Sequence, residues 1–246
     1  MKEEIQKFFR GEVEDDEATL VKYSHDASLL EVRPKLVLFP KDKEDIKNLV
    51  KWVSENSARQ DLAEKYGKIS ITARCAGTDM SGGAIGESII LDFTRHINKL
   101  VGGPLPLDNI SKRKTNKMLG NYPLVTSSIT VEPGMLYQDF EKITLEKGLI
   151  LPCYTASKSL NAMGGMYGNN SAGEKTLKYG KTENYVLEAK VIFSDGNEYI
   201  VKPLTQDELN KKMAQGDFEG DIYKNIFELI DKNSEDIKHA KPNVHK

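Results

Sequence analysis

The chain has 246 residues, and its 35 lysines and arginines nearly balance its 37 aspartates and glutamates to give a net charge of −2. This balance excludes a strongly basic nucleic-acid-binding protein, and the length allows one or two domains with a sizeable core. No apolar stretch approaches the roughly 20 residues that cross a bilayer. The charged first residues lack the apolar segment of a secretory signal. Together with only two cysteines, these features predict a cytoplasmic protein, with peripheral membrane association left open.

The first third of the chain predicts a small parallel α/β unit. After a short helix and an acidic connector in residues 1–28, the apolar segment 37–40 ends at a proline, as strands often do. Apolar residues then recur with the helical period, so we expect a helix from 41 to 53 that the polar stretch 54–66 can extend. Two further segments rich in isoleucine are predicted as strands, at 69–73 and 88–93. This order favours parallel pairing with a crossover helix.

The second half predicts mostly antiparallel structure. The expected elements are a strand at 127–131, a helix at 137–147 ended by Gly148, an edge strand at 149–152, and a hairpin of 185–193 and 198–201 around the turn 194–197. Residues 206–239 carry a helical pattern, and the proline-rich, basic stretch 101–126 is expected to be a mobile loop. We therefore predict an α+β fold with two α/β subdomains: a small parallel βαβ unit, then a mostly antiparallel sheet with helices.

Two glycine-rich stretches carry the chemistry of the chain. Residues 74–83 follow the predicted strand 69–73 directly, and residues 163–173 lie ninety residues later. Both combine glycine with small hydroxyl or amide side chains. Glycine adopts positive φ and lets backbone N–H groups approach an anion, and successive N–H groups form a concave nest for phosphate oxygens. Two such stretches predict one long, phosphate-bearing ligand that is held at two places.

The chain resembles the flavin-binding (PCMH-type) domain of the FAD-linked oxidase family, which includes vanillyl-alcohol oxidase, the flavin-binding part of glycolate oxidase, and D-lactate dehydrogenases. The motifs that carry this resemblance occur in family order and span most of the chain. They are Tyr23–Ser28, Arg33–Pro40, Arg74–Gly83, Val131–Gly134, Leu151–Pro152, Gly164–Gly165, Asn170–Gly173, Tyr179–Thr182 and Asp195–Gly196. The resemblance implies that FAD binds between the two subdomains.

By this resemblance, residues 74–82 hold the pyrophosphate of FAD. The implied contacts in this loop are Arg74, Cys75, Ala76, Gly77, Thr78, Asp79, Ser81 and Gly82. The family commonly has Gly-Gly-Gly or Gly-Ala-Gly where this chain has Cys75-Ala76-Gly77. Cys75 and Ala76 require negative φ, so the hydrogen bonding of the loop is expected to differ in detail.

The resemblance assigns the remaining cofactor contacts to later segments. Gly164 and Gly165 allow close approach to the flavin, and the polar side chains after them can reach its edge or the ribityl chain. The full implied set is Gly134, Pro152, Ser157, Gly164, Gly165, Asn169, Asn170, Ser171, Gly173 and Val191, the last of which would meet the adenine. Cys153 lacks the sequence context of a covalent attachment site, and no histidine lies near the first loop. Non-covalent FAD is therefore expected.

Other phosphate and metal sites fit the sequence poorly. The spacing Gly168-x4-Gly173 is followed by Glu174-Lys175, one residue out of register for a P-loop lysine. The dinucleotide fingerprint G-x-G-x-x-G is absent. The four histidines, 25, 96, 239 and 245, show no metal-binding spacing with nearby ligands. We expect no metal site.

The expected organisation is a first FAD-binding subdomain at 1–95, a second at 96–205, and a helical segment at 206–246 that leads toward a substrate-binding cap domain. The resemblance implies a flavin-dependent oxidoreductase that passes a hydride from a 2-hydroxy acid, such as D-lactate or glycolate, to FAD. Catalytic residues and the electron acceptor stay unassigned, because the substrate contacts of relatives come mainly from the cap. The alternative is a non-catalytic FAD-binding module that needs a partner domain for substrate.

Overall fold

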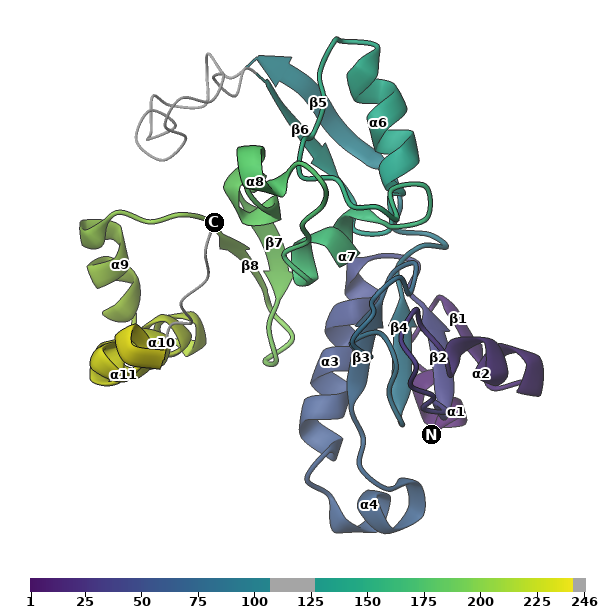
Figure 1. The fold of residues 1–246 in the computed structure, drawn as a ribbon. Coiled ribbons are helices and arrows are strands. Elements are labelled where there is room, and N and C mark those ends of the chain that lie inside the picture. The colour runs from purple at the N-terminus through teal and green to yellow at the C-terminus, as the bar shows by residue number, and fades with distance from the viewer. Residues whose placement is uncertain (107–126, 241–246) are drawn as a thin grey trace. The chain divides into compact units, whose positions relative to one another are not determined.

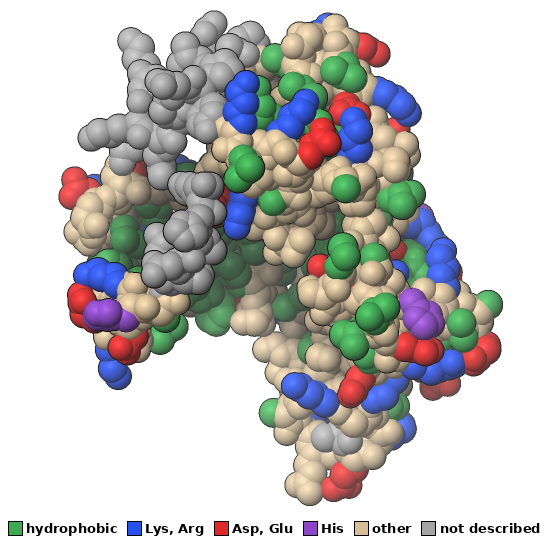
Figure 2. Space-filling view, viewed as in Figure 1, with side chains coloured by type: hydrophobic (Ala, Val, Ile, Leu, Met, Phe, Trp, Pro, Cys, Tyr) green, Lys and Arg blue, Asp and Glu red, His purple; other side chains and the backbone are tan. Residues whose placement is uncertain are grey.

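The computed structural model describes residues 1–106 and 127–240. Contacts divide the chain into two units, Met1–Val186 and Leu187–Lys246. Parallel and antiparallel sheets occur together with helices, as the predicted α+β class requires. On the face that Figure 2 shows, lysine and arginine side chains lie among aspartates and glutamates. No helix in the described part of the chain is long and apolar enough to cross a membrane.

A four-stranded sheet forms the centre of the first unit. Its order is β1 (Glu12–Glu14), β2 (Leu36–Phe39), β4 (Ile89–Asp92) and β3 (Ile71–Arg74). Strands β2, β4 and β3 run parallel, which confirms the predicted parallel unit. The sequence did not predict β1, which pairs antiparallel with β2 at the edge of the sheet.

Helices cover both faces of this sheet because its two central strands are apolar on both sides. All four residues of β2 and all four of β4 are buried. Leu36, Leu38, Ile89 and Leu91 join a core cluster with Leu49 of α3 (Lys43–Asn56), while Val37 and Ile90 pack with Leu20 and Tyr23 of α2 (Glu17–Tyr23). Figure 1 shows α3 beside β3 and α2 beside β2. The short helix α1 (Lys2–Ile5) contributes Ile5 to the first cluster.

The helical pattern was interpreted too generously after residue 53. Helix α3 ends at Asn56, and a separate helix α4 follows at Gln60–Tyr66. The Asn56 side chain donates to the Trp52 carbonyl over 2.7 Å and also accepts from Arg59. Such a side-chain bond competes with the backbone ladder and helps to end the helix.

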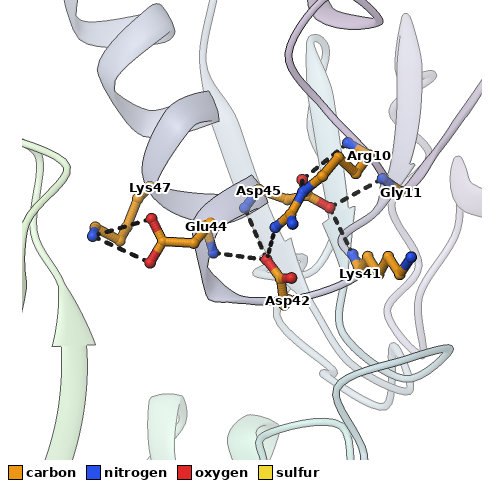
Figure 3. Close-up of polar contacts among 7 residues, drawn as sticks. All are labelled: Arg10, Gly11, Lys41, Asp42, Glu44, Asp45 and Lys47. Carbon is orange, nitrogen blue, oxygen red and sulfur yellow. Dashed lines mark hydrogen bonds and ion pairs between the residues drawn. The ribbon is translucent and has the colours of Figure 1, made fainter.

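A buried carboxylate fixes the N-terminal segment to the sheet (Figure 3). Asp45 is fully buried and accepts backbone N–H groups from Arg10, Gly11 and Lys41 at 2.9, 3.0 and 2.8 Å. The neighbouring Asp42 is partly exposed and caps α3 by accepting from the backbone of Glu44. Asp45 therefore joins three backbone donors, two of which lie more than thirty residues away in sequence.

We predict that Asp45→Ala lowers the free energy of unfolding by about 3 kcal/mol, because it leaves buried N–H groups without an acceptor. Asp42→Ala serves as the control and should cost about 1 kcal/mol, the usual loss for a helix cap. Urea unfolding followed by the fluorescence of Trp52, the single tryptophan, measures both. Equal losses in the two variants would contradict the role assigned to Asp45.

The second sheet pairs β5 (Leu100–Pro106) with β6 (Ser127–Val131) in antiparallel fashion. The prediction of a mobile loop over 101–126 was therefore wrong for 101–106. The register shifts between Leu100 and Gly102 and again between Gly102 and Leu105, so the glycines and prolines that suggested a loop lie in an irregular strand. Residues 107–126 lie outside the described residues.

Helix α6 (Tyr137–Leu145) packs over this part of the unit, and Gly148 follows it at φ 68°, as predicted. The predicted edge strand at 149–152 is wrong. The Leu149 N–H returns to the Thr144 carbonyl over 2.9 Å, and the Leu151 carbonyl accepts from the Tyr137 hydroxyl over 3.0 Å. These backbone groups bond to α6 and not to a neighbouring strand.

The second glycine-rich stretch is helical where we expected an open loop. Residues Met163–Gly168 form the short helix α7, whose buried Met166 joins Tyr137, Phe140 and Cys153 in a core cluster. Helix α8 (Thr176–Tyr179) and the 3-10 turn η2 (Thr182–Tyr185) complete the first unit.

The second unit contains the predicted hairpin and helices. Strands β7 (Ala189–Ile192) and β8 (Glu198–Val201) pair antiparallel around a turn with Gly196 at φ 73°. Strand β7 is shorter than the predicted segment 185–193, and β8 has the predicted length. Three helices follow: α9 (Gln206–Met213), α10 (Phe218–Lys232) and α11 (Ser234–Ala240). Thr205 and Glu208 form a capping box at the start of α9.

Candidate cofactor site

The first glycine-rich loop begins where β3 ends, at Arg74. Gly77 and Gly82 have φ values of 67° and 84°, a left-handed conformation that glycine adopts without a steric penalty. The loop lies at the carboxyl end of a parallel strand, where ligands of α/β sheets commonly bind. Its position and backbone conformation fit the predicted anion-binding role.

Arg74 closes the base of this loop. Its Nη1 donates to the carbonyls of His25 and Ala84 at 2.8 and 3.1 Å, and the guanidinium lies 4.9 Å from the centre of the Tyr23 ring. Burial lowers the pKa of Arg74 from its ordinary value. These contacts join both ends of the loop to the segment that follows α2, so Arg74 acts as a positioning residue within the protein.

A buried carboxylate lies beside Arg74. Asp92, at the end of β4, accepts from the Tyr23 hydroxyl at 2.8 Å and from the N–H and hydroxyl of Thr94 at 2.6 Å each. Burial, together with the adjacent Asp92 charge, raises the pKa of Tyr23. The tyrosine therefore stays a hydrogen-bond donor, and the network fixes the chain on either side of β4.

Three segments far apart in sequence meet at Cys75. The Cys75 thiol donates to the Pro133 carbonyl over 3.4 Å, and the Gly164 N–H donates to the same carbonyl over 2.7 Å. A Cβ atom on Gly165 would lie 3.8 Å from the Cβ of Cys75. The first loop, the Pro133–Gly134 turn and α7 are therefore adjacent, as a cofactor held by both glycine-rich stretches requires.

Burial raises the pKa of Cys75 to about 12. The thiol is thus protonated at neutral pH, which suits its role as a donor to Pro133 and excludes a reactive thiolate. Cys153 is fully buried, and burial also raises its pKa.

The predicted glycines divide into two groups by what surrounds them. Added Cβ atoms on Gly134, Gly164 and Gly173 would overlap backbone or proline atoms of the protein itself. These three glycines are required for close packing between segments. Gly165 is exposed, and the Cys75 Cβ is the nearest atom that a substituent there would meet. Gly165 is therefore the glycine of this group that presents open space to a ligand.

Several predicted polar contacts are used within the protein. The Asn170 side chain bonds to both the carboxylate and the backbone N–H of Glu183, at 2.9 and 3.0 Å, and Asn170 has a φ of 44°. Ser171 is buried, and its carbonyl accepts from Thr182. Ser157 shares a hydroxyl contact of 3.0 Å with Thr155. Asn170 and Ser171 thus shape the backbone after α7.

The other predicted contacts are spread more widely. Asn169 is an exposed residue at the end of α7, and Pro152 is half-buried in the segment after α6. Thr78 and Ala76 are half-buried in the first loop. Val191 lies on β7 in the second unit. The roles assigned to these residues stay predictions.

A cavity of about 470 Å³ borders the first loop. Its lining residues are Ala76, Thr94, Asn98, Gly134, Leu136 and Asp139. Ala76 and Gly134 were predicted, but the other four were not. Thr94 follows the carboxyl end of β4, so the general rule for ligands in α/β sheets could have indicated it. Leu136 and Asp139 enter the cavity only through the packing of α6. Within the described residues, no group of His, Cys, Asp and Glu is arranged to hold a metal ion.

Comparison with known proteins identifies the family. The FAD binding domain model matches residues 34–202. The chain belongs to the FAD binding domain family. This match includes both glycine-rich stretches, the Pro133–Gly134 turn and the hairpin, so FAD is the cofactor of this domain. The fit agrees with the site, where left-handed glycines and the open face of Gly165 leave room for a large ligand.

Individual relatives support this family membership. The chain is similar to a D-2-hydroxyglutarate dehydrogenase of Pseudomonas putida, at 21% identity over 97% of the chain and 21% of the relative. It is 25% identical to glycolate oxidase subunit GlcD of Bacillus subtilis, over 75% of the chain and 33% of the relative. This FAD-binding domain therefore spans about a fifth to a third of the curated relatives it matches.

Solved structures show the same fold. The chain matches an alkyldihydroxyacetonephosphate synthase with a TM-score of 0.57 and 19% identity, over 82% of the chain and 33% of that structure. It matches 6-hydroxy-D-nicotine oxidase from Arthrobacter nicotinovorans with a TM-score of 0.57 and 20% identity, over 82% of the chain and 38% of that structure. These likenesses confirm the predicted fold.

We predict that Gly165→Val abolishes FAD binding while Gly168→Val retains it. Both glycines are exposed in α7, and nothing lies within 4 Å of a Cβ on Gly168. The helical cost of valine is therefore matched, and only Gly165 faces Cys75 and the first loop. Flavin content of the purified variants, read from absorbance near the flavin maximum, checks this. Equal flavin content in both would contradict the placement of the cofactor.

We also predict that neither cysteine of the native domain reacts rapidly with a thiol reagent at pH 8. A pKa of about 12 leaves about one Cys75 molecule in ten thousand as thiolate at that pH. Since folding raises this pKa above its ordinary value of 9.0, the associated stabilisation is complete below pH 9 and is lost as the pH rises toward 12. Ellman titration with and without denaturant measures the reactivity, and rapid native labelling would disprove the prediction.

Proposed function

We propose that this domain is the FAD-binding part of a flavin-dependent 2-hydroxy-acid dehydrogenase. The observation that carries the proposal is the family match over residues 34–202. It is supported by relatives named D-2-hydroxyglutarate dehydrogenase, glycolate oxidase subunit GlcD and D-lactate dehydrogenase. When bound, FAD supplies the chemistry by accepting a hydride from the substrate carbon. The chain's own residues bind and orient the cofactor.

In this proposal, the loop from Gly77 to Gly83 holds the diphosphate, and the open face of Gly165 lies toward the flavin. The neutral Cys75 thiol keeps the two regions together through Pro133 without adding a charge beside the cofactor. We retain the prediction that Val191 meets the adenine. We also retain the expected organisation of subdomains at 1–95 and 96–205, with FAD between them and residues 206–246 leading toward a cap.

The substrate and its proton acceptor are proposed to be bound mainly by the longer part of the relatives that this chain does not match. Of the six residues that line the cavity beside the first loop, only Asp139 carries a titratable side chain. A hydroxy acid needs cationic groups for its carboxylate and a base for its hydroxyl. This same observation favours the second candidate, a non-catalytic FAD-binding module that works with a partner domain.

The test is a titration of the apo-protein with FAD, followed by assays with D-2-hydroxyglutarate, glycolate and D-lactate and a dye as electron acceptor. We expect FAD to bind and turnover to stay far below an ordinary enzyme rate, which is on the order of 10 s⁻¹. Adding the remaining part of a longer relative as a separate chain should then raise turnover. Full turnover by this chain alone would show that the catalytic groups lie within it, and failure to bind FAD would overturn the proposal.

A further inference from the structure

The first glycine-rich loop contains its own anion. The Asp79 Oδ2 atom accepts from the Ser81 N–H at 3.1 Å, from the Ser81 hydroxyl at 2.8 Å and from the Gly83 N–H at 2.6 Å. All three donors are uncharged. They hold the pKa of Asp79 below its ordinary range, with the Gly83 N–H contributing most. The carboxylate is therefore ionised throughout the neutral pH range.

These donors are the ones that a phosphate oxygen would use. Ser81 and Gly83 are exposed residues of a loop whose glycines give it the concave backbone of an anion nest. An N–H group makes one strong hydrogen bond at a time, so a phosphate oxygen and the Asp79 carboxylate compete for the same positions. The carboxylate also lies above Gly83, where an added Cβ would be 3.0 Å from Oδ2.

The nearest arginine of the loop does not offset this charge. Arg74 directs its Nη1 to the carbonyls of His25 and Ala84, which holds the guanidinium at the base of the loop. A diphosphate placed on the loop would therefore approach a carboxylate whose described hydrogen bonds come from neutral groups. Two like charges a few ångströms apart at a solvent-exposed site repel measurably.

We propose that Asp79 is a built-in competitor of the FAD diphosphate for the donors of Ser81 and Gly83 and thereby limits the affinity of the domain for its cofactor. The inference rests on the proposed placement of the diphosphate on this loop. Without cofactor, the carboxylate keeps the loop folded on itself. On binding, Asp79 must rotate away and return both backbone donors to the ligand, and its charge then repels the diphosphate.

The deciding experiment compares the Kd of FAD for the apo-protein and for Asp79→Asn, which keeps the size of the side chain and removes its charge. We expect Asp79→Asn to bind FAD about tenfold more tightly at low ionic strength, a factor that corresponds to about 1.4 kcal/mol. The difference should shrink as KCl rises to about 0.3 M, because salt screens exposed charges. Flavin fluorescence quenching measures Kd without any assay of activity.

The matched control is Asp16→Asn. Asp16 caps α2 by accepting from the Thr19 N–H at 3.0 Å, and its pKa is also lowered by hydrogen bonds from Thr19. The substitution removes the same charge, and asparagine caps helices as well as aspartate. Its FAD affinity should stay within about twofold of the wild type.

An unchanged or weaker FAD affinity in Asp79→Asn would overturn the inference, as would an equal gain in Asp16→Asn. The Gly165→Val and Gly168→Val pair distinguishes this failure from failure of the cofactor site. If Gly165→Val weakens FAD binding while Asp79→Asn does not tighten it, only the competitor role of Asp79 is wrong. If neither variant changes the affinity, the proposed placement of FAD is wrong as well.

Discussion

The close approach of three backbone segments at Cys75 is the constraint on which the site depends. Both the Cys75 thiol and the Gly164 N–H donate to the Pro133 carbonyl. Side chains on Gly134 or Gly164 would overlap neighbouring backbone or proline atoms. The packing therefore needs small residues at each of these places. Burial keeps the Cys75 thiol protonated, so the donor to Pro133 persists across the neutral pH range.

A second set of contacts transmits the order of the sheet to the first loop. Tyr23 bonds to Asp92 at the end of β4, and its ring lies against the Arg74 guanidinium. Arg74 in turn bonds to the carbonyls of His25 and Ala84. The loop is thus supported at its base by α2, β3 and β4, while its tip holds Asp79, Ser81 and Gly83. A rigid base and an exposed tip are suited to binding a ligand whose diphosphate arrives from solvent.

Acidic side chains have three distinct uses in the first unit. The carboxylate of Asp45 is fully buried and serves only the fold, because its partners are backbone donors of segments that must pack together. Asp92 is buried beside the loop and positions Tyr23 and Thr94. Asp79 is half-buried, and its donors are exposed. Only this last arrangement lets a dissolved anion compete for the donors that the carboxylate uses.

The sequence by itself determined the local elements and the family. The continuous apolar runs of β2 and β4, the turn at Gly196 and the helix end at Gly148 depend on local composition and backbone conformation, which a single segment encodes. The glycine-rich motifs likewise indicated FAD before any contact was known. Tertiary structure decided the rest. Residues 149–152 are not a strand because Leu149 and Leu151 bond to α6, and residues 101–106 form a strand because β6 lies beside them. Which glycines pack against the protein and which one stays open follows from neighbouring segments that are distant in sequence. Such contacts leave no periodic pattern in the sequence, since each depends on the shape of a partner elsewhere along the chain.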